Sequence, residues 1–404
     1  MKKIYKKRII GIVLMLAALA ALFFPLQEYF GNRITHNHLR LEGFYLEKPG
    51  SLDVVVMGAS EVYYGYFANE AYRNTKVTSY PYAFSHNPVT LWKYELKEIL
   101  RQQKPKVLVV EVNGAGYGRE PKIKHKKSRK IKRKKIKKVS GRKRKLYSEL
   151  AIRILEDNMP ESDNKRQMLK DLSHVRKDSM LDKCIPFLKF HGQFYDNMSE
   201  DLSEMRKRGN ASMKGIFSRV GWRKQKKEIE VPRDLKSIPM DPTAEKSLKE
   251  FIAVSREMGV KNVLFVRFPH KITDEKGIIN YQRYLRIKEV VEASGCQYAD
   301  FTTLREEAGI SSEKDFVDRE HLNANGARKF TTFLSRYIQA KYRLKSTVLP
   351  KDEKEKWDKG TKYIDAYYKY YNDYPKKHSK LKVLYKTFPE SISVLKGLKQ
   401  YMQK

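Results

Sequence analysis

The sequence predicts an α/β fold with a parallel sheet, and three observations support this prediction. Short, strongly apolar runs alternate along the chain with longer segments in which apolar residues recur at helical spacing. The short runs are apolar throughout, as strands are when helices cover both faces of a sheet. The chain has 404 residues, of which 41% are hydrophobic, so it is long and apolar enough to bury a core. Elements that alternate at these lengths are typical of parallel sheets.

The first part of the predicted sheet domain contributes three strands and one helix. Residues 53–58 form an apolar run that ends in a glycine, and residues 76–82 are predicted as a second strand. Residues 91–102 carry apolar side chains at helical spacing. Pro105 then separates this helix from residues 107–112, which form the clearest buried strand of the sequence.

A second part resumes the same alternation after a long interruption. We predict a helix over 244–258, a strand over 263–266, a helix over 281–294, a strand over 297–301 and a final helix over 324–342. Gly259 and Gly295 directly follow two of these helices, at the position where glycine commonly ends a helix. The two parts together predict one sheet domain that is split in the sequence.

The interruption is interpreted as a basic and helical insertion. From Arg119 to Lys145 the sequence has seventeen Lys or Arg residues and one acidic residue, Glu120. Such a block repels itself and stays solvated until it meets an anionic surface. The residues that follow, up to about 235, are polar and mostly helical in pattern. We therefore interpret 119–235 as an insertion into the sheet domain rather than as an independent domain.

A Lys/Tyr-rich extension follows the last predicted helix. It includes Tyr363, Tyr367, Tyr368, Tyr370 and Tyr371. We expect a solvated extension with a few docked helices, and the alternative is a platform of tyrosine rings that stack on sugars. The predicted organisation is a basic N-terminus at 1–8, an anchor at 9–27, the sheet domain at 28–118 and 236–344, the insertion at 119–235 and the extension at 345–404.

The N-terminal region predicts one transmembrane helix. Residues 9–26 are apolar and uncharged, and a helix of this length spans roughly 27 Å, close to the hydrocarbon thickness of a bilayer. Because a run of basic residues precedes this segment, the positive-inside rule places the N-terminus in the cytoplasm and the large domain outside. A cleaved signal peptide is the alternative, but its apolar region is usually shorter and Phe23-Phe24-Pro25 is a poor cleavage site.

The charge of the chain requires an anionic partner. Lys and Arg number 84 against 47 acidic residues, which gives a formal net charge of +37. Nucleic acid, lipid headgroups and acidic polymers all meet that requirement. Because the anchor places the domain outside the cytoplasm, we exclude nucleic acid and expect an anionic lipid surface and an envelope polysaccharide or teichoic acid.

Cysteine and histidine usage excludes several other classes of protein. The only two cysteines, Cys184 and Cys296, exclude a disulfide-framed small fold and a cysteine-rich zinc module. We expect two unpaired, buried thiols, with a single bridge between them as the alternative. No histidine cluster has metal-ligand spacing, so we expect neither a metal nor another cofactor.

Two distant segments carry the residue types that acyl transfer requires. Ser60 follows Gly58 at the end of the first predicted strand, where ligand sites form in open parallel sheets. Asp318 and His321 lie on one loop before the last predicted helix, at a spacing that lets the carboxylate reach the near ring nitrogen of the imidazole. A nucleophile, a base and a group that orients the base are the parts of an acyl-transfer site. The alternatives are a helix cap for Ser60 and for Asp318, and a packing role for His321.

In these residues the sequence resembles the SGNH (GDSL-like) family of hydrolases and acyltransferases. The run at 54–60 is similar to the family's first block, with Ser60 as the nucleophile, and residues 318–323 are similar to its last block, Asp-x-x-His. The resemblance is greatest for the single-span, membrane-anchored members of bacterial cell envelopes. In particular, the pair Ser60-Glu61 is similar to that of the members that act in D-alanyl transfer to teichoic acids.

The resemblance covers the sheet domain, about half of the chain, and implies a flavodoxin-like three-layer sandwich. It also implies an oxyanion hole formed by the backbone N–H of Ser60, a second backbone N–H and an asparagine side chain. Ala83 stands where the family has a glycine for the second donor, and Asn113 fits the asparagine. The alternative for Asn113 is a turn former before Gly114.

The function that the resemblance implies is that of a membrane-anchored, extracytoplasmic serine esterase or O-acyltransferase. It would act on acyl esters of a cell-envelope polymer, with a membrane-bound acyltransferase as a further partner. Glu61 and Arg267 are expected to bind substrate, and a surface position is the alternative for Arg267. A non-catalytic scaffold that binds anionic polymer or lipid is the alternative function, and Ala83 is the main argument for it.

Overall fold

The computed structural model describes residues 2–31, 36–118, 145–175, 214–215, 218–219, 227–232, 234–377 and 387–388. The chain divides into two compact units. One unit comprises residues 1–35 and 173–208, and the other comprises residues 36–172 and 209–404. The second unit holds the sheet and the candidate site.

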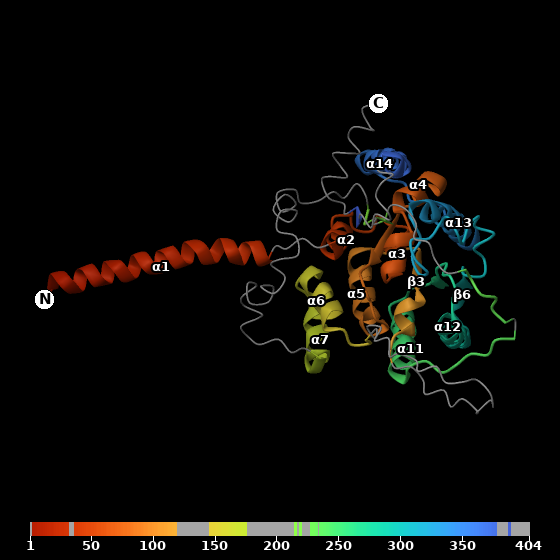
Figure 1. Ribbon diagram of the computed structural model, residues 1–404, viewed down its shortest axis with the longest axis horizontal. Coiled ribbons are helices and arrows are strands. Elements are labelled where there is room, and N and C mark those ends of the chain that lie inside the picture. Colours follow the sequence, from red (N-terminus) through yellow and green to blue (C-terminus); the bar gives the residue numbers. More distant parts are fainter. Residues whose placement is uncertain are drawn as a thin grey trace. The chain divides into compact units, whose positions relative to one another are not determined.

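The first unit consists, in its described part, of helix α1 (Lys2–Gly31) and the 3-10 turn η3 (Ser173–Val175). Helix α1 is drawn in red in Figure 1. It contains the segment 9–27 that the sequence predicts as a transmembrane helix, and side chains such as Ile9 and Leu22 are exposed. Of the helices in the described part of the chain, none combines the length and the apolar character that a membrane crossing requires.

A five-stranded parallel sheet forms the centre of the second unit and confirms the predicted α/β class. Its strands are β1 (Val54–Gly58), β2 (Ser79–Ala83), β3 (Val107–Glu111), β5 (Val263–Arg267) and β6 (Gln297–Asp300). They lie in the order β2-β1-β3-β5-β6. In this doubly wound order the direction of winding reverses between β1 and β3, and ligands bind at the carboxyl ends of the strands beside that point.

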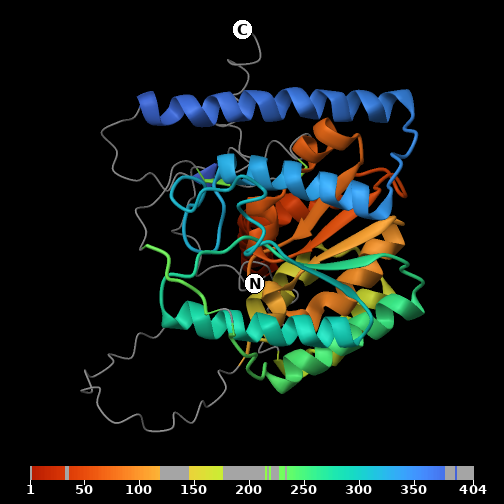
Figure 2. The same ribbon diagram turned by 90° about the vertical axis from the view of Figure 1, so that its right-hand side faces the viewer.

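Helices cover both faces of the sheet (Figure 2). One face carries α3 (Ser60–Gly65), α4 (Ala68–Thr75) and α13 (Ala324–Tyr342), with α14 (Lys351–Lys377) packed outside them. The other face carries α5 (Trp92–Gln102), α11 (Pro242–Glu257) and α12 (Glu275–Ala293). The second unit is therefore built of helix, sheet and helix layers.

Smaller elements complete the second unit. Helix α2 (His36–Tyr45) contacts β2 and α6. Helices α6 (Glu149–Asn158) and α7 (Asp163–Asp171) are the described helical parts of the predicted insertion in this unit. The 3-10 turns are η1 (Val89–Leu91) and η2 (Val112–Gly116), and β4 (Ser218–Arg219) pairs antiparallel with β7 (Thr387–Phe388).

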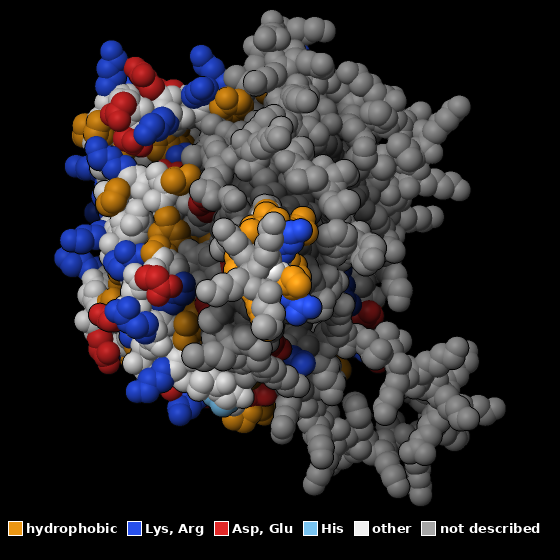
Figure 3. Space-filling view, turned by 90° about the vertical axis from the view of Figure 1, so that its left-hand side faces the viewer, with side chains coloured by type: hydrophobic (Ala, Val, Ile, Leu, Met, Phe, Trp, Pro, Cys, Tyr) orange, Lys and Arg blue, Asp and Glu red, His pale blue; other side chains and the backbone are white. Residues whose placement is uncertain are grey.

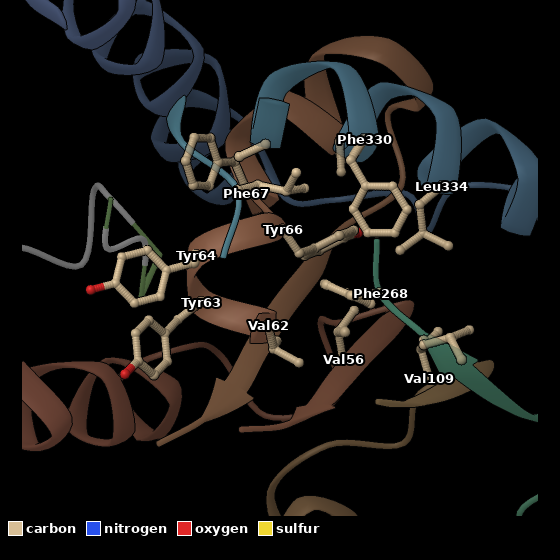
Figure 4. Close-up of a cluster of buried hydrophobic side chains, with 14 of the residues drawn as sticks. Val56, Val62, Tyr63, Tyr64, Tyr66, Phe67, Val109, Phe268, Phe330 and Leu334 are labelled. Atoms are coloured by element: carbon tan, nitrogen blue, oxygen red, sulfur yellow. The ribbon is translucent and has the colours of Figure 1, made fainter. Parts of the chain in front are cut away.

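The core beneath α3 and α13 is aliphatic and aromatic (Figure 4). Val56 of β1 and Val109 of β3 belong to the same buried cluster as Phe268 and, from α13, Phe330 and Leu334. The rings of Phe268 and Phe330 pack edge to face with 4.6 Å between their centroids. Full burial of each such side chain contributes about 1.5–3 kcal/mol to folding. This packing holds α3 and α13 against the sheet and so fixes the segments that bear the candidate site.

Two helices begin earlier than their apolar spacing indicates. Helix α12 starts at Glu275, where the side chain of Asp274 accepts a hydrogen bond of 2.9 Å from the N–H of Gly277. Helix α11 starts at Pro242, where Asp241 accepts one of 2.9 Å from Thr243. The first turns of both helices are polar, so capping residues rather than apolar periodicity mark their starts.

The tyrosines of the C-terminal extension are packed inward where the structure describes them. On α14, Tyr367 and Tyr368 are 2% and 3% exposed and belong to the core, and Trp357 is fully buried. The alternative prediction that these rings form a sugar-stacking platform is therefore wrong for Tyr367 and Tyr368. The side chains of Tyr370 and Tyr371 lie outside the described residues.

Other sequence predictions fall partly outside the described residues. The basic block from Arg119 to residue 144 lies outside them, and so does Cys184. Cys296 is a free thiol that is only partly buried. On the face drawn in Figure 3, Lys and Arg side chains (blue) are interspersed with Asp and Glu side chains (red) over the described surface.

Candidate active site

Ser60 is positioned by an abrupt change from strand to helix. Strand β1 ends at Gly58, and α3 begins at Ser60 with Ala59 as its N-cap. The side chain of Ser60 does not cap the helix; its Oγ instead contacts His321 and Glu61. The hydroxyl is thus held by side chains at the carboxyl end of β1, where doubly wound sheets bind ligands.

Gly58 allows the chain to make this turn against its neighbours. Its φ is 157°, and a Cβ atom there would lie 2.7 Å from Cγ2 of Val62 and 2.8 Å from Cβ of Glu111. Its carbonyl oxygen accepts a hydrogen bond of 3.1 Å from Nδ2 of Asn87. The close approach of β1, α3 and β3 at this point therefore requires a residue without a side chain.

Ser60, His321 and Asp318 form a continuous chain of hydrogen bonds. Nε2 of His321 lies 2.9 Å from Oγ of Ser60, and Nδ1 lies 2.9 and 3.0 Å from the two carboxylate oxygens of Asp318. With Asp318 as the acceptor at Nδ1, Nε2 is the unprotonated nitrogen and accepts from the serine hydroxyl. Oε2 of Glu61, at 3.3 Å, is a second and more distant acceptor for the same hydrogen.

The loop that carries Asp318 and His321 is braced by its own backbone. The N–H of Val317 donates to the carbonyl of His321 at 2.9 Å, and Phe316 and Leu322 form an isolated antiparallel bridge. Oδ1 of Asp318 also accepts the backbone N–H groups of Glu320 at 2.9 Å and His321 at 3.0 Å. These bonds orient the carboxylate before any substrate arrives.

Mutual hydrogen bonding shifts the pKa values of Asp318 and His321 apart. Burial acts to lower the pKa of His321, but the hydrogen bond and negative charge of Asp318 outweigh it and raise that pKa above the ordinary 6.5. Burial acts to raise the pKa of Asp318, whereas the hydrogen bond and charge of His321, with two backbone N–H groups, bring it well below the ordinary 3.8. Asp318 is therefore ionised at neutral pH, and the raised pKa of His321 makes its imidazole a stronger base.

Asn113 lies behind the nucleophile in a buried side-chain network. It follows β3 in η2, is 1% exposed, and donates through Nδ2 to Oε1 of Glu61. Its Oδ1 accepts from the hydroxyl of Tyr284 on α12. The structure thus connects Asn113 to the neighbour of Ser60 in sequence, and Glu61 is the acceptor for its amide in this state. The turn-former alternative leaves these side-chain bonds unexplained.

Glu111 is a buried carboxyl group beside this network that motif reasoning missed. Burial raises its pKa well above the ordinary value, and the nearby Glu61 raises it further. Its Oε1 accepts the N–H of Asn113 at 2.9 Å, and it is fully buried. These effects favour the protonated form of Glu111 relative to an exposed carboxyl group. The signal in the sequence was an acidic residue inside the apolar run 107–112.

Ala83 lies at the same edge of the sheet as Ser60. It ends β2, pairs in register with Gly58 and is fully buried. Shortly after it, Oγ of Ser85 forms a hydrogen bond of 2.8 Å with the hydroxyl of Tyr63, which ties the segment to α3. A second backbone N–H donor to the oxyanion is expected at this position. The assignment of Ala83 as that donor stays a prediction.

Arg267 is not a surface residue. It ends β5 and is 2% exposed, and its guanidinium packs over the ring of Tyr284 at 4.0 Å. Its Nη2 lies 3.3 Å from Nδ1 of His270, whose Nε2 is 3.9 Å from Oε1 of Glu61. Arg267 and His270 thus reach the network behind Ser60. The spacing of Tyr281 and Tyr284 on α12 was the signal for this packing, because residues three apart share a helix face.

The described residues show no group of three or more His, Cys, Asp or Glu side chains arranged to hold a metal ion. The site therefore consists of a hydroxyl, an imidazole, carboxyl groups and an amide, together with the buried arginine. Comparisons of the chain with protein-family models, with curated proteins and with solved structures found no significant match.

The chemical capacity of the site follows from the order of its groups. The imidazole can remove the hydroxyl hydrogen of Ser60 while Asp318 stabilises the resulting positive charge. The hydroxyl lies at a partly exposed position at the strand end, so an acyl carbonyl can approach it. Such an arrangement suits nucleophilic attack on an ester and formation of a covalent acyl intermediate.

Proposed function

We propose that this protein is a serine esterase or O-acyltransferase of the SGNH type, with Ser60 as nucleophile, His321 as base and Asp318 as the residue that orients the base. The observation that carries the proposal is the unbroken chain of hydrogen bonds from Asp318 through His321 to Oγ of Ser60, at 2.9–3.0 Å at each step. The strand order also agrees with the flavodoxin-like sandwich of that family.

The proposed reaction has two steps. His321 takes the proton of Ser60 as Oγ attacks the acyl carbonyl, and it then gives the proton to the departing alcohol as the tetrahedral intermediate collapses to an acyl-serine. In the second step His321 takes a proton from water or a sugar hydroxyl as that oxygen attacks the acyl carbon; the bond to Oγ of Ser60 then breaks, and His321 returns the proton to Ser60. Hydrolysis and transfer differ only in this acceptor.

The proposed oxyanion hole uses the N–H groups of Ser60 and Ala83 and the amide of Asn113. In this proposal the developing oxyanion competes with Glu61 for Nδ2 of Asn113, since Glu61 accepts that bond in the unliganded site. One such donor contributes about 2.7–4 kcal/mol to transition-state stabilisation.

We further propose that the substrate is an acylated polymer of the cell envelope and that a membrane-bound acyltransferase is a partner. The net charge of +37 supports an anionic polymer or lipid surface as the neighbour of the protein. To test this, the acyl content of the surface polymer is measured in strains that carry the parent protein, Ser60→Ala or Ser294→Ala. Ser294 serves as the matched control because, among the described residues, its Oγ bonds to nothing but the carbonyl of Val290 in α12.

We expect Ser60→Ala to match a deletion strain and Ser294→Ala to match the parent. A transferase predicts loss of the ester in Ser60→Ala, and a hydrolase predicts its accumulation. Acyl content at the parent level in Ser60→Ala, with loss only on deletion, would contradict catalysis and favour the scaffold.

The proposed location is the cell membrane, with a single N-terminal span and the sheet domain outside. Val348 is 94% exposed and Ile4 is 59% exposed, so a cysteine at either position is accessible to a reagent on its own side. In a background with Cys184→Ser and Cys296→Ser, we expect Val348→Cys to react with an impermeant maleimide in intact spheroplasts. We expect Ile4→Cys to react only after lysis. The reverse pattern, or equal reaction of both before lysis, would refute the proposed topology.

A further inference from the structure

A small pocket adjoins the candidate triad and is not explained by it. Its volume is about 30 Å³, and its lining includes Asn113, Arg267, Lys271, Tyr284, Arg319 and Glu320. Asn113 connects it to Glu61 and so to the nucleophile, whereas Glu320 directly precedes His321 in the sequence. One water needs only about 10–15 Å³ of such space, so the pocket admits a group larger than a single water.

Arg267 places a buried guanidinium with unsatisfied N–H groups at this pocket. It is 2% exposed, and neither Nε nor Nη1 has a hydrogen-bond partner. Within the described part of the chain, no carboxylate forms an ion pair with it. The rings of Tyr284 and Tyr281, at 4.0 and 4.7 Å, stabilise the cation but supply no counter-ion. Buried N–H groups of a charged side chain that lack hydrogen-bond partners destabilise a fold, so their presence at a pocket points to a ligand.

Lys271 adds a second cation that is not paired with a carboxylate among the described residues. It is 7% exposed, and its Nζ donates to the carbonyl of Ser312 at 2.7 Å. Burial lowers its pKa from the ordinary 10.5 by more than the negative charge of Glu228 raises it. Its backbone N–H donates to the carbonyl of Arg319 at 2.8 Å, which ties the lysine to the loop of Asp318 and His321.

Arg319 stands at the rim of the pocket with its charge shared between two carboxylates. Its side chain is 44% exposed, and it lies 3.6 Å from Asp274 and 3.4 Å from Glu320. The three cations of the lining thus face one carboxylate of the lining, that of Glu320. The balance within the pocket is positive, and an incoming anion would be met by a buried guanidinium, an ammonium and a partly exposed guanidinium at the rim.

We propose that this pocket binds an oxyanion, a phosphate or carboxylate group that belongs to the ester substrate and lies next to the ester itself. The inference rests on the proposed ester chemistry at Ser60 and names the class of substrate. Guanidinium groups match the planar or tetrahedral arrangement of such oxygens, and hydrogen bonds between ionised groups are stronger than neutral ones. An anion there would hold the ester close to the triad and favour anionic esters over neutral ones.

Paired ester substrates test the proposal and distinguish its two sources of charge. The first pair, p-nitrophenyl succinate and p-nitrophenyl butyrate, places a carboxylate on the acyl side. The second pair, acetylglycerol phosphate and acetylglycerol, places a phosphate on the alcohol side. In at least one pair we expect the anionic ester to have the higher kcat/KM by about 10-fold or more. Preference in the first pair indicates a carboxylate, and preference in the second indicates a phosphate.

Three variants connect that preference to the pocket. Arg267→Met keeps an unbranched side chain without the charge, and Arg319→Gln removes the charge of a residue that is 44% exposed. We expect both to lower the ratio of kcat/KM for the anionic ester to kcat/KM for the neutral ester. The control Lys288→Gln removes a cation that is 47% exposed and pairs with Glu292 on α12, and it should keep the preference.

Binding of inorganic phosphate separates failure of this proposal from failure of the proposed catalysis. Calorimetry on full-length Ser60→Ala should show phosphate binding that weakens in Arg319→Gln made in the same background, whether or not the parent turns over any ester. Phosphate binding that is equal in both proteins would overturn the pocket, and so would the absence of phosphate binding together with equal use of neutral and anionic esters. If Arg267→Met does not fold, Arg319→Gln and Lys271→Gln decide the outcome.

Discussion

Ser60→Ala is expected to abolish covalent labelling by a fluorophosphonate and to lower kcat on a small neutral ester by a factor on the order of 10⁴ or more. The hydroxyl of Ser60 is the last group of the hydrogen-bond chain and lies 2.9 Å from Nε2 of His321. Alanine removes the only atom that can bond to the acyl carbon. Labelling is measured by mass spectrometry of the modified peptide, and kcat by release of p-nitrophenol.

The control for this prediction is Ser294→Ala, because the same hydroxyl is removed at the C-terminal end of α12. We expect labelling and kcat of the control to equal those of the parent. Equal labelling of the parent and Ser60→Ala would rule out Ser60 as the nucleophile. Labelling of a serine other than Ser60 in the parent would also rule out Ser60 as the nucleophile.

Asp318→Asn is expected to lower kcat by a factor of about 10³–10⁴, as loss of the orienting carboxylate does in serine hydrolases. Asparagine keeps the size of the side chain but cannot hold His321 in the tautomer that leaves Nε2 unprotonated. Its amide also provides no charge to stabilise the imidazolium. Asp163→Asn is the matched control, since its side chain is 98% exposed and lies on α7.

The pH dependence gives Asp318→Asn a second readout. Only neutral His321 can accept the serine proton, so kcat/KM falls as pH falls through the pKa of His321. Because Asp318 raises that pKa above 6.5, the acid limb of the parent profile should lie above 6.5. In Asp318→Asn the raising charge is absent, so the acid limb should move to lower pH. An acid limb at the same pH in both proteins, or a parent kcat in Asp318→Asn, would contradict the pairing.

Local pattern was sufficient for most of the fold. The predictions match the structure almost to the residue for the strands at 54–58 and 107–111 and for the helix at 324–342. Buried strands are continuous apolar runs and amphipathic helices repeat apolar residues at helical spacing, so both can be recognised in a sequence. The starts of α11 and α12 were missed, since their first turns are polar and their caps are single side chains. The α/β class followed from the alternation of these elements and did not depend on any one of them.

The sequence by itself also determined the pairing of Asp318 with His321, because a separation of three residues on one loop leaves the carboxylate within reach of the ring. Only the tertiary structure decided that this pair meets Ser60, which is 261 residues away from His321 and reaches it because the ends of β1 and α13 lie at one edge of the sheet. The burial of Arg267, the raised pKa of Glu111 and the bond from Asn113 to Glu61 were likewise decided by tertiary packing. Each depends on side chains from different elements and on the loss of water around them, so none of the three can be read from a single segment of the sequence.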